Sequence, residues 1–230
     1  LKTVMDFSFF DKVNTAKNEQ TDTWFKGLDR VYNNFVYDYL YPNPASVLAF
    51  IENHDTDRFL GEGENLDMLK QASTLLLTTR RIPQLYYGTE VMMNGVKSKS
   101  DGYVRKDFPG GWTDDKENAL TPEGRTRLQN ESYNFYRNLL NWRKGNDVIA
   151  KGSMKQFMVQ HGVYAYARQY KGKTVFVLLN GTDKEVKLPL KYYAEVLKDK
   201  TQGKDVISGK VTALNEELTM APRQSMVIEL

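Results

Sequence analysis

An amide, an imidazole and two carboxylates follow one another closely at Asn53, His54, Asp55 and Asp57. They come directly after the apolar run Ser46-Val47-Leu48-Ala49-Phe50, which is typical of a fully buried strand. Catalytic and ligand-binding groups of parallel α/β sheets lie at the carboxyl ends of the strands, where this pattern places all four side chains. A His-Asp pair alone is a weak signal, because turns and helix starts are rich in both residue types. Whether this pair marks a functional site therefore depends on the secondary-structure elements around it.

The segments around this pattern alternate between strand and helix periodicities. Short apolar runs predict strands at residues 3–7, 46–50 and 82–87. Apolar residues at helical spacing predict helices at residues 24–38, 64–79 and 125–143. In the first of these helices, one face is predicted to carry Trp24, Leu28, Val31 and Phe35. Three strand–helix units in succession indicate a parallel α/β sheet, but they do not close a (β/α)8 barrel, which needs eight units.

The pattern changes near Lys144-Gly145-Asn146-Asp147. Beyond it, turn signals such as Lys171-Gly172 and Asn180-Gly181 separate short strand patterns. These predicted strands are residues 163–170, 174–180, 206–207, 211–214 and 225–230, with one short helix at 192–197. The sequence therefore predicts an α/β domain at residues 1–146 followed by an all-β domain, an antiparallel β-sandwich, at residues 147–230.

The composition excludes several classes of protein. The 230 residues are 40% hydrophobic and 12% aromatic, which is enough for a sizeable core. The formal net charge is +3, from 32 basic and 29 acidic residues without a basic run, so nucleic acid is not expected as a partner. No apolar stretch approaches the roughly 20 residues of a membrane-spanning helix, so no membrane partner is expected either. The absence of cysteine excludes disulfides and thiolate chemistry.

The first residues, Leu1-Lys2-Thr3-Val4-Met5, resemble neither an initiator segment nor a signal peptide, and they look like the inside of a strand. We expect the chain to begin within a larger protein. The compartment is then set by the upstream segment: periplasmic or extracellular with a signal peptide, cytoplasmic without one.

Three stretches occur together in an order that narrows the family. They are Val4-Met5-Asp6-Phe7, Phe50-Ile51-Glu52-Asn53-His54-Asp55 and Ile82-Pro83-Gln84-Leu85-Tyr86-Tyr87-Gly88-Thr89-Glu90. They resemble the sixth, seventh and eighth barrel strands of the alpha-amylase superfamily of glycoside hydrolases. The loop from Asp101 to Trp112, with Gly124-Arg125 and Gln129-Asn130, is similar to the neopullulanase and cyclomaltodextrinase branch. The resemblance continues through the β domain and covers nearly the whole chain.

This resemblance implies roles for individual residues. Asp55 aligns with the family's third catalytic carboxylate, which stabilises the transition state by holding sugar hydroxyls at the cleavage subsite. His54 aligns with the imidazole that binds the same hydroxyls, and Asp101 and Arg105 align with a pair that contacts a glucose further from the cleaved bond. From the residues alone, Asp55 could instead cap the next turn, and Asp101 with Arg105 could be a surface ion pair. No metal and no cofactor are expected.

The family's nucleophile and general acid have no counterpart in this chain. In the family they follow the fourth and fifth barrel strands, and the resemblance here begins at the sixth. The resemblance therefore implies the C-terminal part of a retaining hydrolase that cleaves α-1,4 bonds in cyclodextrin, pullulan or maltooligosaccharides and takes part in starch degradation. The chain alone is expected to be inactive.

The expected partners are an alpha-glucan and the N-terminal remainder of the barrel, whereas the oligomeric state, including a homo-oligomer, stays open. The alternative function is a non-catalytic carbohydrate-binding or scaffold module.

Overall fold

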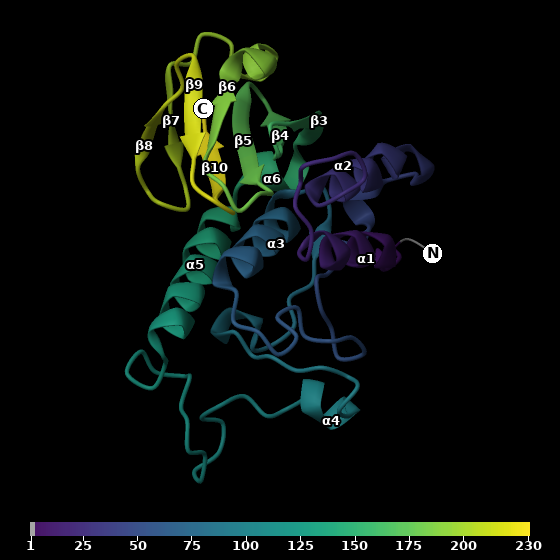
Figure 1. Cartoon of the computed structure of the whole chain (residues 1–230), viewed down its shortest axis with the longest axis vertical. Helices are drawn as coiled ribbons and strands as arrows, with labels where there is room; N and C mark the ends of the chain where they lie inside the picture. The colour runs from purple at the N-terminus through teal and green to yellow at the C-terminus, as the bar shows by residue number, and fades with distance from the viewer. Residues whose placement is uncertain (1–2) are drawn as a thin grey trace.

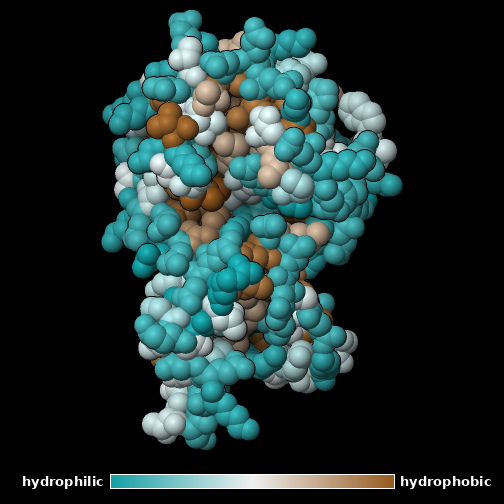
Figure 2. All heavy atoms as spheres, turned by 60° about the vertical axis from the view of Figure 1, so that its left-hand side comes forward, coloured by the Kyte–Doolittle hydropathy of each residue, from teal (hydrophilic) through white to brown (hydrophobic). Residues whose placement is uncertain are grey.

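The computed structural model describes residues 3–230, so Leu1 and Lys2 of the predicted first strand lie outside the described residues. Figure 1 shows strands gathered at one end of the molecule, helices beneath them, and long loops that extend to the opposite end. On the face drawn in Figure 2, hydrophobic groups reach the surface only in small areas between hydrophilic side chains. None of the helices within residues 3–230 is long and apolar enough to cross a membrane.

The elements have the following bounds. The helices are α1 (Phe7–Ala16), α2 (Leu28–Val36), α3 (Leu66–Thr78), α4 (Asp101–Val104), α5 (Arg127–Arg143), α6 (Asp147–Lys151) and α7 (Ala194–Leu197), with 3-10 turns η1 (Tyr37–Leu40), η2 (Pro44–Ser46), η3 (Thr89–Val91) and η4 (Leu190–Tyr193). The strands are β1 (Leu48–Ala49), β2 (Ile82–Pro83), β3 (Ser153–Gln160), β4 (Val163–Tyr170), β5 (Lys173–Asn180), β6 (Val186–Pro189), β7 (Gln202–Asp205), β8 (Val211–Ala213), β9 (Glu217–Met220) and β10 (Ser225–Glu229).

The three predicted barrel strands lie side by side in sequence order. β1 pairs in parallel with β2, and Met5 forms a parallel bridge with Leu48 at the other edge of β1. The pairing is much shorter than predicted, and residues 3–230 contain no closed barrel. The parallel order still brings the carboxyl ends of these segments to one edge, which is what the candidate site requires.

Two predictions for the N-terminal part are wrong. The strand at residues 3–7 stops after Met5, because Asp6 caps a helix: its Oδ1 accepts the Phe9 N–H at 2.8 Å and α1 begins at Phe7. The helix at residues 24–38 begins only at Leu28, because Phe25 has a φ of 62° in the left-handed region. Trp24 therefore lies outside the helix and is 70% exposed instead of sharing its buried face.

The helices predicted at residues 64–79 and 125–143 are confirmed as α3 and α5. The Asn65 side chain caps α3 by accepting the Met68 N–H at 3.0 Å. α5 begins with a capping box, in which the side chains of Thr126 and Gln129 bind each other's backbone N–H. Both helices therefore combine a periodic apolar face with a defined start.

The C-terminal part is antiparallel, as predicted. β3-β4-β5-β10-β7-β8 form a six-stranded sheet, and β6 and β9 form a two-stranded sheet. The strand predicted at residues 206–207 is wrong, because β7 ends at Asp205, whose carboxylate accepts the Ile207 and Ser208 N–H groups and closes a turn. The predicted helix at 192–197 is divided between η4 and α7, whereas β3, β6 and β9 were not anticipated.

The central strands β4, β5 and β10 of the six-stranded sheet are largely buried on both faces. One face contributes Tyr164, Tyr166, Val175, Val177, Leu179 and Val227 to a core shared with side chains of α1, α2, α3 and α5. The opposite face packs against β6, β9 and α7 through Val163, Ala165, Ala167, Phe176, Leu178 and Ile228. Successive residues of β4 therefore alternate between two cores. The division into domains at residues 146 and 147 stays a prediction.

Candidate active site

The turn after β1 presents His54 and Asp55 to solvent. Asn53 is buried, and its Oδ1 accepts the Asp55 N–H at 2.8 Å, while its own N–H binds Thr56 Oγ1 at 3.0 Å. This Asx turn leaves the side chains of His54 and Asp55 each 60% exposed. Within residues 3–230 the Asp55 carboxylate accepts no backbone N–H group, so the turn is closed by Asn53 rather than by Asp55.

The four residues singled out from the sequence form one cluster. His54 Nε2 lies 3.3 Å from Asp55 Oδ2, and Arg105 Nη2 lies 2.9 Å from Asp55 Oδ1. The same Arg105 nitrogen lies 3.2 Å from Asp101 Oδ2, while Arg105 Nε donates to the His54 carbonyl at 2.9 Å. The surface ion pair of Asp101 with Arg105 does form, but it is continuous with Asp55.

Lys97 is also part of this cluster, although its sequence context did not single it out. Its Nζ donates to the Asp55 carbonyl at 3.0 Å and lies 3.4 Å from Asp101 Oδ1. Its backbone N–H donates to Asp57 Oδ1 at 2.6 Å. The only signal in the sequence is a basic residue in a polar loop, which is too common to select Lys97 without the fold.

A buried ion pair between Glu52 and Arg58 stabilises the turn that carries His54 and Asp55. Glu52 and Arg58 are 2% and 1% exposed, and Arg58 Nη1 lies 3.4 Å from Glu52 Oε1. Glu52 also accepts hydrogen bonds from the Phe59 N–H and the Thr89 hydroxyl. Burial raises the pKa of the Glu52 carboxyl, although these donors and the Arg58 charge oppose the shift. The pair joins the two ends of the segment that carries Asp55.

Arg58 also ties the loop after β2 to the turn after β1. Its Nε donates to the Val104 carbonyl at 3.0 Å, and its Nη1 donates to the Tyr87 carbonyl at 2.6 Å. Its guanidinium lies over the Tyr86 ring, 3.9 Å from the centroid. Burial, reinforced by a hydrogen bond with Tyr87, raises the pKa of the Tyr86 phenol to about 12. Since Val104 ends α4, which carries Asp101, Arg58 positions both halves of the cluster.

The loop after β2 depends on a glycine at its first turn. Gly88 has a φ of 82°, and its carbonyl accepts the Met93 N–H at 2.9 Å. A Cβ at this position would lie 2.1 Å from Met93 Sδ. A side chain at residue 88 would therefore displace the turn that directs the loop toward His54 and Asp55.

The exposed cluster is suited to binding hydroxyl groups. A carboxylate accepts several hydrogen bonds and a guanidinium donates several in fixed directions, so Asp55 and Arg105 together can hold adjacent hydroxyls. Within the part of the chain that the structure describes, no three His, Asp or Glu side chains gather in an arrangement that would hold a metal ion.

Comparison with known proteins identifies related sequences. Residues 154–229 match the family described as "Cyclo-malto-dextrinase C-terminal domain". An alpha-amylase of Niallia circulans is 29% identical over 220 residues, which are 92% of this chain and 38% of that protein. A cyclomaltodextrin glucanotransferase of Thermoanaerobacterium thermosulfurigenes is 32% identical over 177 residues, or 77% of this chain and 22% of that protein. The chain therefore spans well under half the length of these relatives.

Solved structures share the fold over the whole chain. The crystal structure of an Anoxybacillus alpha-amylase superposes with a TM-score of 0.77 at 18% identity, covering 100% of this chain and 47% of that chain. The alpha-amylase of Geobacillus thermoleovorans, complexed with acarbose, gives a TM-score of 0.77 at 19% identity, covering 100% of this chain and 48% of that chain. The resemblance seen in the sequence is thus confirmed: this chain is similar to alpha-amylases and cyclomaltodextrin glucanotransferases, and residues 154–229 match the cyclo-maltodextrinase C-terminal domain.

Proposed function

We propose that this chain supplies the transition-state-stabilising part of the active site of a retaining alpha-glucan hydrolase. The enzyme would cleave α-1,4 bonds in cyclodextrin, pullulan or maltooligosaccharides, as in the neopullulanase and cyclomaltodextrinase branch. The observation that supports this most is the exposed cluster at the carboxyl end of β1, where Asp55 contacts both His54 and Arg105. The names of the related proteins, alpha-amylase and cyclomaltodextrin glucanotransferase, also support an enzyme that acts on alpha-glucans.

Asp55 has free hydrogen-bonding capacity for a sugar. Arg105 contacts Oδ1 and His54 contacts Oδ2, and each carboxylate oxygen has two lone pairs, so each keeps one for a hydroxyl group. Hydrogen bonds to a sugar ring that strengthen as it approaches an oxocarbenium ion lower the barrier and do not merely increase binding. His54 would bind the same hydroxyls, and Asp101 and Arg105 would contact the next glucose unit.

The nucleophile and the general acid would come from protein outside this chain. Large apolar side chains of α1, η1 and β2 are exposed, which is unusual for a finished surface: Phe7, Tyr37, Tyr39, Leu40 and Ile82. We propose that the N-terminal remainder of the barrel packs against them and completes the sheet. The 230-residue chain alone would then bind sugar without cleaving it.

Release of reducing ends from pullulan and β-cyclodextrin tests this function. The assay compares this chain with the complete parent protein, and the parent with its Asp55→Asn variant. Loss of the charged acceptor is expected to lower kcat about 100- to 1000-fold, since transition-state hydrogen bonds to the sugar contribute several kcal/mol. Asp67→Asn is the matched control, because Asp67 is also exposed but lies in the first turn of α3.

The outcomes separate the alternatives. If the complete parent cleaves neither glucan, the proposed hydrolase function is wrong. Binding of maltooligosaccharide by that inactive parent would instead support a non-catalytic carbohydrate-binding module. Full activity of Asp55→Asn would remove Asp55 from the mechanism.

A further inference from the structure

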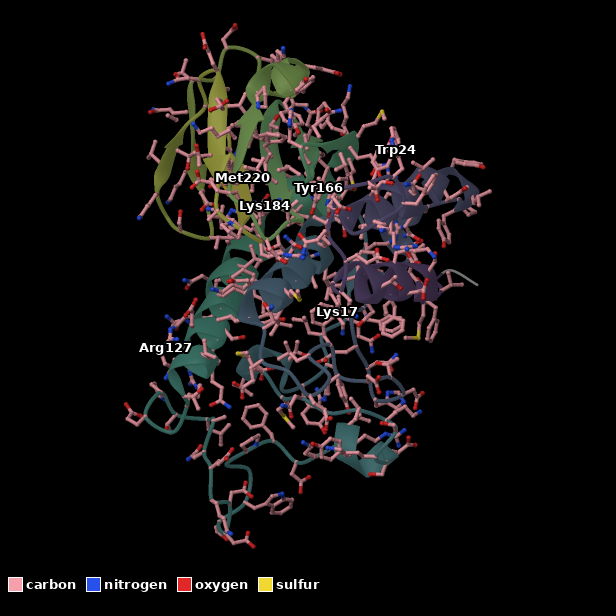
Figure 3. All side chains as sticks on the ribbon, viewed as in Figure 1. Lys17, Trp24, Arg127, Tyr166, Lys184 and Met220 are labelled. Atoms are coloured by element: carbon pink, nitrogen blue, oxygen red, sulfur yellow. The ribbon has the colours of Figure 1, made fainter. Side chains whose placement is uncertain are left out.

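An open cleft lies where the loop before α2 meets the turns of the antiparallel sheet. Its volume is about 550 Å³, and we call it the Trp24 cleft; its walls are residues 21–24, Asp29, residues 158–162, Thr182 and residues 184–186. Figure 3 labels Trp24 beside α2, at the strand-bearing end of the molecule, whereas α4 of the Asp55 cluster lies toward the opposite end in Figure 1. The Trp24 cleft is therefore separate from the candidate active site.

The indole of Trp24 is exposed on a loop that is held firmly. The Thr21 N–H donates to the Gly181 carbonyl at 2.9 Å, which fastens the start of the loop to the sheet. The Phe25 N–H donates to Asp29 Oδ2 at 2.7 Å, which fastens its end to α2. Phe25 has a φ of 62°, a conformation that costs a bulky residue energy and that the surrounding bonds maintain. The protein thus keeps a large aromatic ring, 70% exposed, in a defined place.

The opposite wall is equally well defined. His161 has a φ of 52° in the turn between β3 and β4, so it too is held in the left-handed region. A Cβ on Gly162 would lie 3.0 Å from the Thr21 carbonyl oxygen, which shows how closely the two walls approach. Asn180 Oδ1 accepts both the N–H and the hydroxyl of Thr182, at 3.0 and 2.8 Å, and orders the third segment.

The polar side chains of the Trp24 cleft are available to a ligand. Within residues 3–230, six of them make no side-chain hydrogen bond or ion pair to protein: Asp22, Thr23, Gln160, His161, Lys184 and Glu185. Carboxylates, an ammonium group and neutral hydrogen-bonding groups therefore surround the indole ring of Trp24. Asp22, Asp29 and Glu185 outnumber the ammonium of Lys184, so the lining disfavours an anion. Its many donors and acceptors around an apolar ring suit a ligand with an apolar face and many hydroxyl groups.

A pyranose ring has that chemistry, because its axial C–H groups form an apolar face and its hydroxyls lie around the edge. We propose that the Trp24 cleft is a second alpha-glucan-binding site, in which a glucose unit stacks on Trp24 and Lys184 and the neighbouring carboxylates bind its hydroxyls. The identity of the sugar rests on the proposed function. Such a site holds a long glucan on the protein independently of the turnover at Asp55.

Calorimetric titration of the 230-residue chain with maltoheptaose tests the proposal. Trp24→Ala is expected to weaken binding about tenfold, and Trp24→Tyr, which keeps an aromatic surface, should recover most of the loss. Trp112→Ala is the matched control, since Trp112 is another tryptophan with 64% exposure, on the loop after α4. The effect of Trp24→Ala should be the same in a chain that also carries Asp55→Asn, because the two sites are separate.

Several results would overturn the proposal. They are no binding by the unmodified chain, equal affinities of Trp24→Ala and the unmodified chain, or a loss seen only with Trp112→Ala. A urea midpoint of Trp24→Ala equal to that of the unmodified chain excludes unfolding as the cause of weaker binding.

The two proposals fail in different ways. Trp24-dependent binding together with an inactive parent rejects the proposed hydrolase and keeps the Trp24 cleft. An active parent whose Trp24→Ala variant adsorbs to starch like the unmodified protein rejects the Trp24 cleft and keeps the hydrolase.

Discussion

Replacing Arg58 by methionine removes a buried cation that holds three parts of the candidate active site together. The change leaves the Glu52 carboxylate without its cation and the Val104 and Tyr87 carbonyl groups without their donor. Breaking a buried pair from one side costs about 3–5 kcal/mol, and each abandoned buried acceptor costs about 1–3 kcal/mol. These costs overlap at one site and do not add, and Glu52 can take up a proton, so we expect Arg58→Met to lower the free energy of unfolding by about 4 kcal/mol.

Urea unfolding followed by circular dichroism measures this loss. With a slope of about 2 kcal/mol per molar urea, the midpoint should fall by about 2 M. The double variant Glu52→Gln/Arg58→Met should be less destabilised than the sum of the single variants, by at least about 1 kcal/mol, because the uncompensated charge is gone. Arg127→Met is the control: the side chain of Arg127, labelled in Figure 3, is 83% exposed and pairs with Glu131 at 3.5 Å.

The prediction is refuted if Arg58→Met and Arg127→Met unfold at the same urea concentration. It is also refuted if the losses of Glu52→Gln and Arg58→Met simply add, since the two side chains would then not interact.

Three further predictions concern the site and its frame. In the enzyme proposed as the parent, Arg105→Met should raise KM for maltoheptaose about tenfold in steady-state assays, because the sugar loses a guanidinium that spans two carboxylates. An unchanged KM contradicts this. The Arg30 guanidinium holds the pKa of the Glu19 carboxyl below its usual 4.5, so Glu19→Gln should lower the free energy of unfolding by about 1 kcal/mol or less at pH 7. In urea titrations at several pH values, the difference in stability between Glu19→Gln and the unmodified chain should vanish as the pH falls through the folded-state pKa of Glu19. The Arg168 guanidinium donates to four backbone carbonyls. Arg168→Leu should therefore lower the thermal midpoint by several degrees and the free energy of unfolding by at least about 3 kcal/mol. A loss below about 1 kcal/mol would show that water takes over the hydrogen bonds to these carbonyls.

The sequence was sufficient for the elements that bring the candidate site together. Short apolar runs placed β1 and β2 in order, and parallel pairing then brought His54 and Asp55 to the same edge as the loop with Asp101 and Arg105. α3 and α5 were predictable because apolar periodicity and capping residues agreed. The catalytic and binding roles of these four residues stay predictions.

The parts that were missed depend on contacts distant in sequence or on unusual backbone. Asp6 followed by phenylalanines resembles a strand end, and only its bond to the Phe9 N–H shows that a helix begins there. The exposure of Trp24 follows from the left-handed conformation of Phe25, which residue type does not predict. Glu52 and Arg58 were visible as charges near the motif, but the role of Arg58 comes from a carbonyl at Val104, 46 positions away.

The tyrosine-bearing face of the six-stranded sheet limits how this protein can be recombined. Tyr164 and Tyr166 on β4 and Val227 on β10 belong to the same core as side chains of α1, α2, α3 and α5, so the interface is shaped by both sides at once. In a chimaera that takes only the C-terminal strands from a relative, the side chains of the sheet no longer match the helix side chains that they pack against. Exchange between relatives should therefore succeed when the facing helix residues are transplanted together with the sheet, and protease nicking near residue 145 should leave two pieces that stay associated.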